Sequence, residues 1–439
     1  MTPGLPLRMA IGPQWAGPLP SDWRVGTIRR FARVFAGGTP DKSIERYWQN
    51  GTVPWLASGE VNQWLITEPT TYITEEALRN SSARWVSRNA LVVALAGQGR
   101  TKGMAAQMGI DATCNQSLAA IVPDDRIHPR FLLWWLAAHY ETLRNLAGGE
   151  LRDGLNLDII SSVPVPLPSL ATQRSVADYL DRETTRIDAL IAAKRRLVAL
   201  LAERFAEARN QAVRGAGPQG SRQQGPAWLA DVPAHWSIKR LKFISRMDSG
   251  HTPDRKIPEY WVDCTIPWVT LNDVGELDHS WELTEVTNAI NELGMANSSA
   301  HPIPAGSVIL SRDATVGRAA ILARPMAVSQ HFVSWTCGGD LEPEYLLQVI
   351  RGPMQQHFGT LTAGATIATI GMPELRELVI PVPPLDEQRQ IVKRIRHLQR
   401  SYDEITNRVT VQVGLLQERR QALITAAVIG ELEIPEVAA

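Results

Sequence analysis

The sequence predicts a mixed α/β (α+β) protein made of two similar domains, each followed by a long helix. Three observations lead to this prediction. The chain has 439 residues, enough for two to four domains. A segment with helical heptad spacing, residues 170–213, returns as residues 385–428. The rest of the chain repeats in the same order, so we expect an internal pseudo-twofold duplication.

The repeat begins near the N-terminus and continues through both domains. WAGPLPSDW from Trp15 resembles WLADVPAHW from Trp228, and the motifs GTP and HTP follow at Thr39 and Thr252. NSSA occurs from 80 and from 297, and GMAA from Gly103 matches GRAA from Gly317. Apolar runs near residues 91 and 307 predict short buried strands. Segments 129–140 and 343–350 begin with proline and predict helices.

Proline-rich segments connect each domain to its long helix. Pro164, Pro166 and Pro168 cannot lie in a helix interior, so the chain should run extended until the helix begins. Between the two copies, RGAGPQGSRQQGPAW is rich in Gly, Pro, Gln and Ser, and we expect a flexible linker there. The predicted boundaries are a first domain at 1–169, a long helix at 170–214, the linker at 215–227, a second domain at 228–384 and a second helix at 385–430.

Apolar residues in both long helices alternate with spacings of four and three, the pattern of a coiled-coil seam. A helix of this length runs about 60 Å, more than one domain needs. Its simplest partner is its own repeat, packed antiparallel; the alternative is two separate helices, each packed on its own domain. Glu183 and Lys194 interrupt the first seam and are interpreted as markers of register. The predicted seam residues are Leu180, Ile187, Leu190, Leu197, Leu201, Ile395, Leu398, Ile405, Val409 and Leu416.

Composition excludes several classes of protein. Lys plus Arg and Asp plus Glu are both 45, so bulk charge gives no attraction for nucleic acid, and DNA binding must use local patches. The three cysteines show no C-x-x-C spacing, which argues against a disulfide framework or a structural zinc site. The sequence has no run of eighteen apolar residues and no apolar leader, so we expect a cytoplasmic protein without contact to a membrane.

Catalytic motifs are not found in the sequence. It lacks the Asn/Asp-Pro-Pro-aromatic motif of DNA amino methyltransferases, the phosphate-binding loop and the H-E-x-x-H metal motif. PDKSIER from Pro40 resembles a nuclease carboxylate cluster, but its repeat PDRKIPE from Pro253 places the charges differently. We therefore expect no catalytic residue, metal or cofactor in this chain, and a role in binding or assembly.

Motifs at the domain exits carry a family resemblance over nearly the whole chain. PVPPLDEQRQI from Pro381, its weaker counterpart PLPSLATQRSV from Pro166, and TAGATIATI from Thr362 resemble the specificity subunit of type I restriction-modification systems. The first copy departs from this pattern, because GGELRDGLN replaces TAGATIATI and Ala171-Thr172 replaces Asp386-Glu387.

The resemblance implies two target recognition domains, each reading one half of a bipartite sequence in double-stranded DNA, with the coiled coil setting the gap. It implies two partner modification subunits that bind S-adenosylmethionine and methylate adenine, with restriction subunits as optional further partners. The specificity chain itself is non-catalytic, and the complex would hold the adenine methyltransferase and endonuclease activities. Two alternatives remain: a coiled-coil scaffold that bridges proteins without DNA specificity, and a specificity subunit of an orphan or fused methylation system.

Comparison of the two copies predicts which residues read DNA. Positions that are identical in both copies should hold the scaffold and phosphates, whereas loops that differ should choose bases. Arg pairs with guanine, and Asn or Gln with adenine, in the major groove. The paired tryptophans Trp48/Trp261 and Trp55/Trp268 are interpreted as core anchors rather than stacking platforms. The candidate DNA-binding residues are Thr39, Gln98, Arg100, Thr101, Lys102, Asn115 and Gln116 in the first copy, and Thr252, Arg312, Asp313, Thr315, Arg318, Gln330 and His331 in the second.

Overall fold

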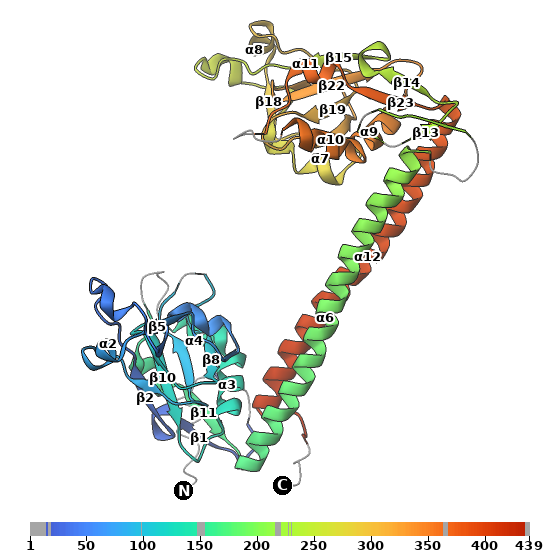
Figure 1. The fold of residues 1–439 in the computed structure, drawn as a ribbon. Coiled ribbons are helices and arrows are strands. Elements are labelled where there is room, and N and C mark those ends of the chain that lie inside the picture. The colour runs from blue at the N-terminus through green and yellow to red at the C-terminus, as the bar shows by residue number, and fades with distance from the viewer. Residues whose placement is uncertain are drawn as a thin grey trace. The chain divides into compact units, whose positions relative to one another are not determined.

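A computed structural model describes residues 15, 19–97, 99–146, 154–215, 221–226, 228–229, 231–362 and 368–434. The chain divides into two compact units. Unit 1 comprises Met1–Lys194 and Val411–Ala439, and unit 2 comprises Arg195–Thr410. Both units combine twisted sheets with helices, so the predicted mixed α/β class is confirmed (Figure 1).

Unit 1 contains a five-stranded sheet of order β2-β10-β7-β8-β4, a four-stranded sheet of order β5-β3-β9-β6 and a two-stranded sheet, β1-β11. The strands are β1 Arg24–Thr27, β2 Ala32–Ala36, β3 Val53–Leu56, β4 Leu65–Ile66, β5 Thr71–Ile73, β6 Trp85–Val86, β7 Leu91–Ala94, β8 Ala105–Met108, β9 Ala112–Cys114, β10 Leu118–Pro123 and β11 Pro164–Leu167. The helices that accompany them are α2 Glu75–Arg79, α3 Pro129–Ala138, α4 Tyr140–Asn145 and α5 Leu157–Ser162.

Unit 2 repeats these sheets with the orders β15-β22-β19-β20-β17, β18-β16-β21 and β14-β23, and adds the pair β12-β13. The strands are β12 Arg222–Gln223, β13 Val232–Pro233, β14 Ser237–Arg240, β15 Ser245–Ser249, β16 Ile266–Val269, β17 Glu282–Leu283, β18 Asn288–Ile290, β19 Val308–Ser311, β20 Ala319–Leu322, β21 Ala327–Val328, β22 Phe332–Cys337 and β23 Val379–Val382. Its short helices are α7 Glu276–His279, α8 Glu292–Ala296, α9 Pro343–Arg351, α10 Met354–Leu361 and α11 Met372–Arg376.

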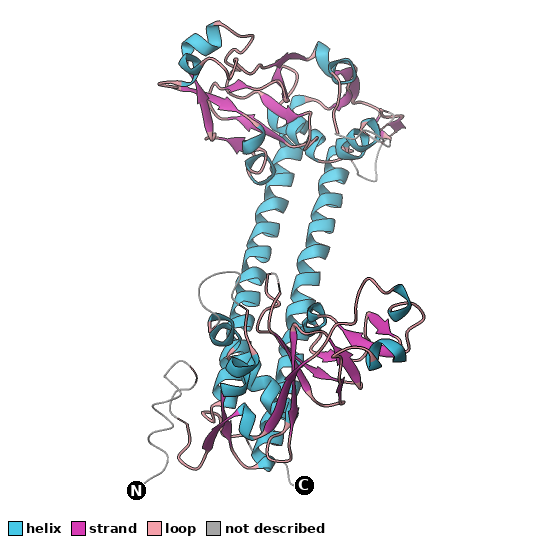
Figure 2. Cartoon of the chain, turned by 90° about the vertical axis from the view of Figure 1, so that its left-hand side faces the viewer, coloured by secondary structure: helices cyan, strands magenta, loops and turns pink. Residues whose placement is uncertain are grey.

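Matching parallel pairs show that the two units share one topology. β3 pairs in parallel with β9, and β4 with β8, while β16 pairs in parallel with β21, and β17 with β20. Strand β6 of unit 1 corresponds to an isolated bridge between Ile303 and Met326 in unit 2. The predicted internal duplication is therefore present in the fold itself (Figure 2).

The central strands form where the sequence has short apolar runs. Every residue of β7 and β19 is buried, because each strand lies between a neighbour on both sides and side chains on both faces. Helices α3 and α9 each begin with proline in the first turn and bury a large apolar surface against the five-stranded sheet. Pro164 and Pro166 lie in β11, paired with β1, so the predicted extended exit is confirmed.

The two long helices, α6 (Leu170–Val213) and α12 (Leu385–Val428), pair antiparallel within each unit. In unit 1, Asp188 accepts a hydrogen bond from Arg420 at 2.9 Å, and Lys194 donates to Gln412 at 2.6 Å. In unit 2, the rings of Phe205 and Tyr402 stack with centroids 5.3 Å apart. Partner numbers fall on α12 as they rise on α6, as an antiparallel pair requires. Within the described part of the chain, no helix is both long enough and apolar enough to cross a bilayer.

The predicted seam is correct at some positions and shifted by one residue at others. Leu180, Ile187, Ile395 and Val409 are buried, and Leu201, Leu398 and Leu416 are half-buried. Leu190, Leu197 and Ile405 are 46%, 43% and 43% exposed, so their assignment to the seam is wrong.

The neighbouring residues Ile191, Val198 and Thr406 take the three positions in the seam, as their greater burial shows. Periodicity does not separate these neighbours, because adjacent residues are both apolar at 190–191 and 197–198, and at 405–406 the apolar residue of the pair is Ile405 while the seam takes Thr406. The heptad spacing is unchanged; only its phase moves by one residue at alternate positions.

The segment predicted to be a flexible linker is partly a β-strand. Arg222 and Gln223 form β12 and pair with Val232 and Pro233 of β13. The Arg222 guanidinium donates to the carbonyl oxygens of Arg214 and Gly215. These contacts join residues about ten positions apart, and the composition of the segment gave no sign of such pairing.

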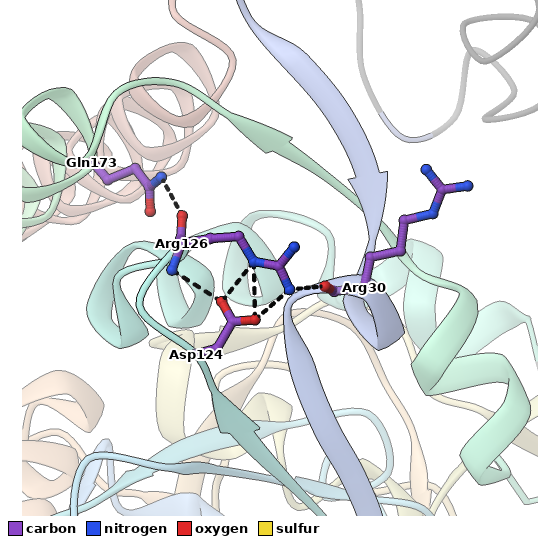
Figure 3. Close-up of polar contacts among 4 residues, drawn as sticks. All are labelled: Arg30, Asp124, Arg126 and Gln173. Carbon is purple, nitrogen blue, oxygen red and sulfur yellow. Dashed lines mark hydrogen bonds and ion pairs between the residues drawn. The ribbon is translucent and has the colours of Figure 1, made fainter.

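A buried glutamine in the first turn of each long helix connects it to the loop before α3 or α9. Gln173 accepts a hydrogen bond from the His128 amide at 2.7 Å and donates to the carbonyls of Arg126 and Pro168. Figure 3 shows its bond to the Arg126 carbonyl. Arg126 is itself held by Asp124, which forms an ion pair with its guanidinium. The Q-R motif at the start of each helix thus has a structural role.

Gln388 repeats this arrangement in unit 2. Its oxygen accepts from the Glu342 amide at 2.9 Å, and its nitrogen donates to the carbonyls of Asp340 and Pro383, both at 2.9 Å. Buried polar groups are costly unless paired, and both the oxygen and the nitrogen of each of these amides have partners. Each glutamine thus connects the start of its long helix to the domain that precedes it.

Candidate nucleic-acid interface

A threonine and a glutamine meet at the same place in each unit, where the chain crosses between two sheets. Thr39 follows β2, and Gln116 lies between β9 of the four-stranded sheet and β10 of the five-stranded sheet. The Thr39 hydroxyl donates to the Gln116 side-chain oxygen. In unit 2, Thr252 donates to Gln330 in the same way. The structure thus brings four of the predicted residues together as two matching pairs.

Glycines allow the backbone to reach this crossing point. A Cβ built on Gly37 would lie 2.0 Å from the Cys114 carbonyl oxygen, and one on Gly250 would lie 1.5 Å from that of Val328. No side chain fits at either contact. The close approach places Thr39 against the 115–117 turn, and Thr252 against the 329–331 turn.

The turn that follows each threonine is held by a tryptophan. The indole N–H of Trp48 donates to the Asp41 carbonyl at 3.1 Å, and that of Trp261 to the Asp254 carbonyl at 3.2 Å. Each of these rings packs on a buried tryptophan, Trp55 in unit 1 and Trp268 in unit 2. All four therefore support the turns from inside, in agreement with their interpretation as core anchors.

In unit 2, the Thr252–Gln330 pair lies in a cleft of about 620 Å³. The cleft wall is rich in groups that donate or accept hydrogen bonds, and two buried ones, the Trp268 indole N–H and the Ser329 hydroxyl, have no partner among the described residues. The polar side chains that line it are Thr252, Arg255, Thr270, Asn272, Asn288, Ser329, Gln330 and His331. Such a surface can bind the edge of a base or a phosphate through several hydrogen bonds at once.

Arg312, Asp313 and His331 form one network beside this cleft. The His331 ring lies 3.0 Å from the Asp313 carboxylate, and the Arg312 amide donates to the His331 carbonyl at 2.9 Å. The Arg312 side chain donates to the Ile370 carbonyl at 3.0 Å. Thr315 lies in the same loop and is exposed. These predicted residues are grouped in space, although the Arg312 side chain is occupied by backbone.

Arg318 lies in a different environment from the other candidates. Its guanidinium forms an ion pair with Asp278, and both line a cavity between α9 and the long helices of unit 2, apart from the cleft that holds Gln330. Arg312 and Arg318 flank one loop in the sequence, so both were predicted to lie at the same site. Gly317, with a φ of +96°, turns the chain just before Arg318, which therefore lies outside the group formed by Arg312, Asp313 and His331.

The loop of unit 1 that contains Arg100, Thr101 and Lys102 was predicted to read bases, and helix α4 contacts it. The Tyr140 hydroxyl of α4 donates to the Arg100 carbonyl, and Arg144 donates to that hydroxyl at 2.9 Å. Thr101 accepts the Met104 amide through its carbonyl, at 3.0 Å, so the loop is a closed turn that also contains Lys102. Asn115 caps its own turn by accepting the Ser117 amide at 3.1 Å.

Some predicted positions lie outside the described residues. They are Gln98, residues 148–153 of the GGELRDGLN segment and residues 363–367 of TAGATIATI. Thr369 and Ile370, which end the latter motif, contact Asp313 and Arg312.

A buried carboxylate in each unit was missed by sequence reasoning. Glu60 accepts hydrogen bonds from the amide and hydroxyl of Thr70, and Asp273 accepts from the amides of Thr270 and Thr287 at 2.8 and 2.7 Å. Glu60 lies 21 residues after Thr39, and Asp273 lies 21 residues after Thr252. This shared spacing of an acid in the two copies could have identified them in the sequence. They fix the loop that borders the crossing point.

Comparison with known proteins agrees with this geometry. The model of the type I restriction modification DNA specificity domain matches twice, at residues 20–198 and 233–414. The chain is 23% identical over 433 residues to the type I restriction enzyme MjaIX specificity subunit of Methanocaldococcus jannaschii, covering 96% of both chains. It is 21% identical over 437 residues to the EcoKI specificity subunit of Escherichia coli K12, covering 95% of this chain and 90% of that one.

Solved structures share the fold. A chain from work on complex assembly and conformational transition of the type I R-M system has a TM-score of 0.74 at 18% identity, covering 95% of this chain and all of that one. The HsdS subunit of Thermoanaerobacter tengcongensis has a TM-score of 0.58 at 19% identity, with the same coverage. With two matches to the domain model that together span most of its length, this chain belongs to the type I restriction-modification specificity subunit family.

Proposed function

We propose that this chain is the DNA sequence-recognition subunit of a type I restriction-modification complex and binds a bipartite target, one half-site per unit. The observation that carries the proposal is the matched pair of polar crossing points, Thr39–Gln116 and Thr252–Gln330, on two units of one topology. Two similar binding faces on one chain suit a DNA site that has two separate halves.

The chemistry at these points supports reading of base edges. A glutamine amide carries both an acceptor and two N–H donors and can pair with adenine in the major groove. Gln116 and Gln330 are exposed, and each is oriented by its threonine. The surrounding residues differ between the units: Asn115 and Ser117 in one correspond to Ser329 and His331 in the other. Different neighbours would give the two half-sites different sequences.

The long helices would set the distance between the half-sites. Antiparallel contacts between the two helices occur within each unit, Asp188–Arg420 and Lys194–Gln412 in unit 1 and Phe205–Tyr402 in unit 2. A pair of packed helices resists bending, because each seam residue inserts between residues of the other helix. The gap in the DNA target would then be a consequence of helix length.

The chemistry of modification would be supplied by partners. Two methyltransferase subunits that bind S-adenosylmethionine and methylate adenine would dock on this chain, and restriction subunits would add endonuclease activity. The chain itself would guide these enzymes without catalysing a step. It would act in the cytoplasm, where bacterial and archaeal DNA is found.

One experiment separates this function from that of a protein-bridging scaffold. The chain is purified with the methyltransferase encoded beside its gene, and binding to a library of bipartite DNA duplexes is measured by gel shift. Enrichment of one pair of half-sites at one spacing supports the proposal. Stable assembly with the methyltransferase but equal binding to all duplexes would support the scaffold instead. With labelled S-adenosylmethionine, the isolated chain should transfer no methyl group to DNA.

A further inference from the structure

A polar cavity of about 390 Å³ lies in unit 2 where the end of α6, the first half of α12 and helix α9 meet. It is separate from the cleft that contains Gln330. Three arginines line it, Arg209, Arg318 and Arg351, together with two carboxylates, Asp278 and Asp403, and the amide of Gln348.

Arg351 is fixed in this cavity by neutral partners. Its Nε donates to the Ala319 carbonyl at 2.9 Å, and one Nη donates to the carbonyls of Leu277 and Ser280. These bonds orient the guanidinium but do not neutralise it. Burial, together with the nearby charge of Arg209, lowers the pKa of Arg351 to about 10. A lowered pKa means that the cavity disfavours the positive charge it holds.

Two further donors in the cavity have no acceptor. Arg209 Nε is buried and unpaired among the described residues, although its guanidinium lies 5.6 Å from the centre of the Phe205 ring. Gln348 is only 2% exposed, and its side-chain nitrogen is likewise unpaired. An unpaired buried donor is costly, and more so when it is charged.

Neither acid that lines the cavity forms an ion pair with Arg209 or Arg351. Asp278 forms an ion pair with Arg318, although its charge also acts on Arg351, and Asp403 accepts a hydrogen bond from the neutral Gln399 amide at 2.7 Å. With three arginines and two carboxylates in the lining, the described part of the cavity carries an excess of positive charge. An anion from outside the chain would supply the missing acceptors.

Unit 1 has apolar residues in place of the three donors Arg209, Gln348 and Arg351. Counting from the buried glutamines Gln173 and Gln388, Arg209 of α6 corresponds to Ile424 of α12. Counting from the first proline of α3 and α9, Gln348 corresponds to Trp134 and Arg351 to Ala137. Ile424 and Trp134 are each 2% exposed and belong to the apolar core of unit 1. Replacement of a tryptophan by glutamine also leaves room for a ligand.

We propose that this cavity in unit 2 is a binding site for a phosphate group, held by the guanidinium groups of Arg209 and Arg351 and the amide of Gln348. A guanidinium presents planar pairs of N–H donors that match the oxygens of a phosphate, and Arg209 has an unpaired Nε for this. Arg351, whose Nε and one Nη bind backbone carbonyls, would offer its other Nη. The phosphate has two chemical sources, a free phosphate ion or a phosphate of the DNA backbone. The site would exist whether or not the proposed half-site reading is correct.

Thermal unfolding of the full chain tests the site, with inorganic phosphate as the probe and sodium chloride at matched ionic strength as the reference. The Tm of the natural chain should rise steadily with phosphate concentration above the chloride curve, since a ligand bound only to the folded state stabilises it. Arg209→Ile, the residue that unit 1 has at this place, should raise the Tm in phosphate-free buffer and abolish the phosphate response. The control Arg204→Ile removes an exposed arginine of the same helix and should keep the response.

A second variant keeps the test valid if Arg209→Ile folds poorly. Gln348→Met retains both arginines but removes one donor, and should weaken the apparent phosphate affinity about tenfold. A natural chain that responds to phosphate no more than to chloride overturns the proposal. So does a response that remains unchanged in both variants.

DNA binding distinguishes the two sources of phosphate. If the cavity holds a backbone phosphate, Arg209→Ile should weaken binding to all duplexes equally and reduce the slope of log affinity against log salt by about one. If it holds a free ion, DNA affinity and its salt slope should be the same in the natural chain and in Arg209→Ile, while the thermal response still differs. Loss of half-site preference is expected in neither case, so failure of the site and failure of the proposed function can be distinguished.

Discussion

The guanidinium of Arg130 on α3 lies 2.8 Å from the carboxylate of Asp181 on α6, and the corresponding pair in unit 2 has the opposite polarity. There, Glu344 of α9 forms an ion pair with Arg396 of α12. In both units the arginine also lies over a tryptophan ring, Trp64 or Trp281. Each globular part therefore docks on its helix through the same bridge with exchanged charges.

The first prediction concerns this bridge. Arg130→Glu should destabilise unit 1, because it places two carboxylates together, whereas Arg130→Glu combined with Asp181→Arg should recover much of the loss by reproducing the polarity of unit 2. A coupling energy of about 1–2 kcal/mol is expected for this half-buried pair. Urea unfolding of the two single variants and the double variant measures it. Additive single effects would show that the bridge contributes no coupling; Arg46→Glu, at the exposed pair with Glu76, is the control.

The second prediction concerns the buried glutamines. Gln388→Ala leaves the Glu342 amide and two carbonyls without their partner, and should lower the free energy of unfolding by about 2–4 kcal/mol. Gln211→Ala, on the exposed surface of α6, is the matched control and should change it by less than about 0.5 kcal/mol. Chemical unfolding followed by circular dichroism measures both. An equal change in the free energy of unfolding in both variants would show that Gln388 does not stabilise the contact between helix α12 and its domain.

The third prediction concerns pH. His139 is buried, with Nδ1 2.9 Å from the Trp135 carbonyl and its ring 4.0 Å from that of Trp135, and burial lowers its pKa below 6.5. The unfolded chain then takes up a proton first as pH falls, so stability should decline as pH falls below 6.5. Thermal unfolding between pH 5 and pH 8 should show this decline in the natural chain and a shallower one in His139→Gln.

His301 provides a control of opposite sign. Its hydrogen bond to Asp248 raises the pKa of the imidazole above 6.5. Stability from this pair is present below pH 6.5 and is lost as pH rises through the folded pKa. His301→Gln should therefore lower the Tm below pH 6.5, where the pair stabilises the natural chain, and its Tm should approach that of the natural chain as pH rises. An identical pH profile for both variants and the natural chain would contradict these assignments.

Most of the fold could be predicted because the chain repeats itself. The paired prolines, the Q-R motif and the buried runs at 91 and 308 occur twice, so each copy supported the interpretation of the other. The phase of the seam was harder to predict, since Leu190 and Ile191 are both apolar and only packing of the second helix selects Ile191.

The site was predictable where both copies share a residue and not where they differ. Thr39 and Gln116 align with Thr252 and Gln330, and the structure pairs them. The surroundings of Arg318 depend on Asp278, which lies 40 residues earlier in the sequence and follows no motif. Contacts of that kind are set by tertiary packing alone.

The fourth prediction concerns base choice. Gln116→Ala should relax the preference for bases in one half-site only, and Gln330→Ala in the other, by about 1–3 kcal/mol at the affected position. Arg100→Ala should change the same half-site as Gln116→Ala. Binding to duplexes that vary one half-site at a time measures this. Equal weakening on every sequence would mark a phosphate contact instead.

The last prediction concerns the length of the helical rod. Residues 187–193 of α6 face residues 414–420 of α12, because Asp188 contacts Arg420 and Lys194 contacts Gln412. Removal of both heptads preserves the seam and shortens each helix by about 10 Å. At about 3.4 Å per base pair, the tolerated gap between half-sites should shrink by about three base pairs. Removal of the α6 heptad alone shifts one helix against the other and should reduce stability instead. Sequencing of methylated sites in cells that carry the doubly shortened chain measures the gap, and an unchanged gap in a folded, active complex would show that the helices do not set it.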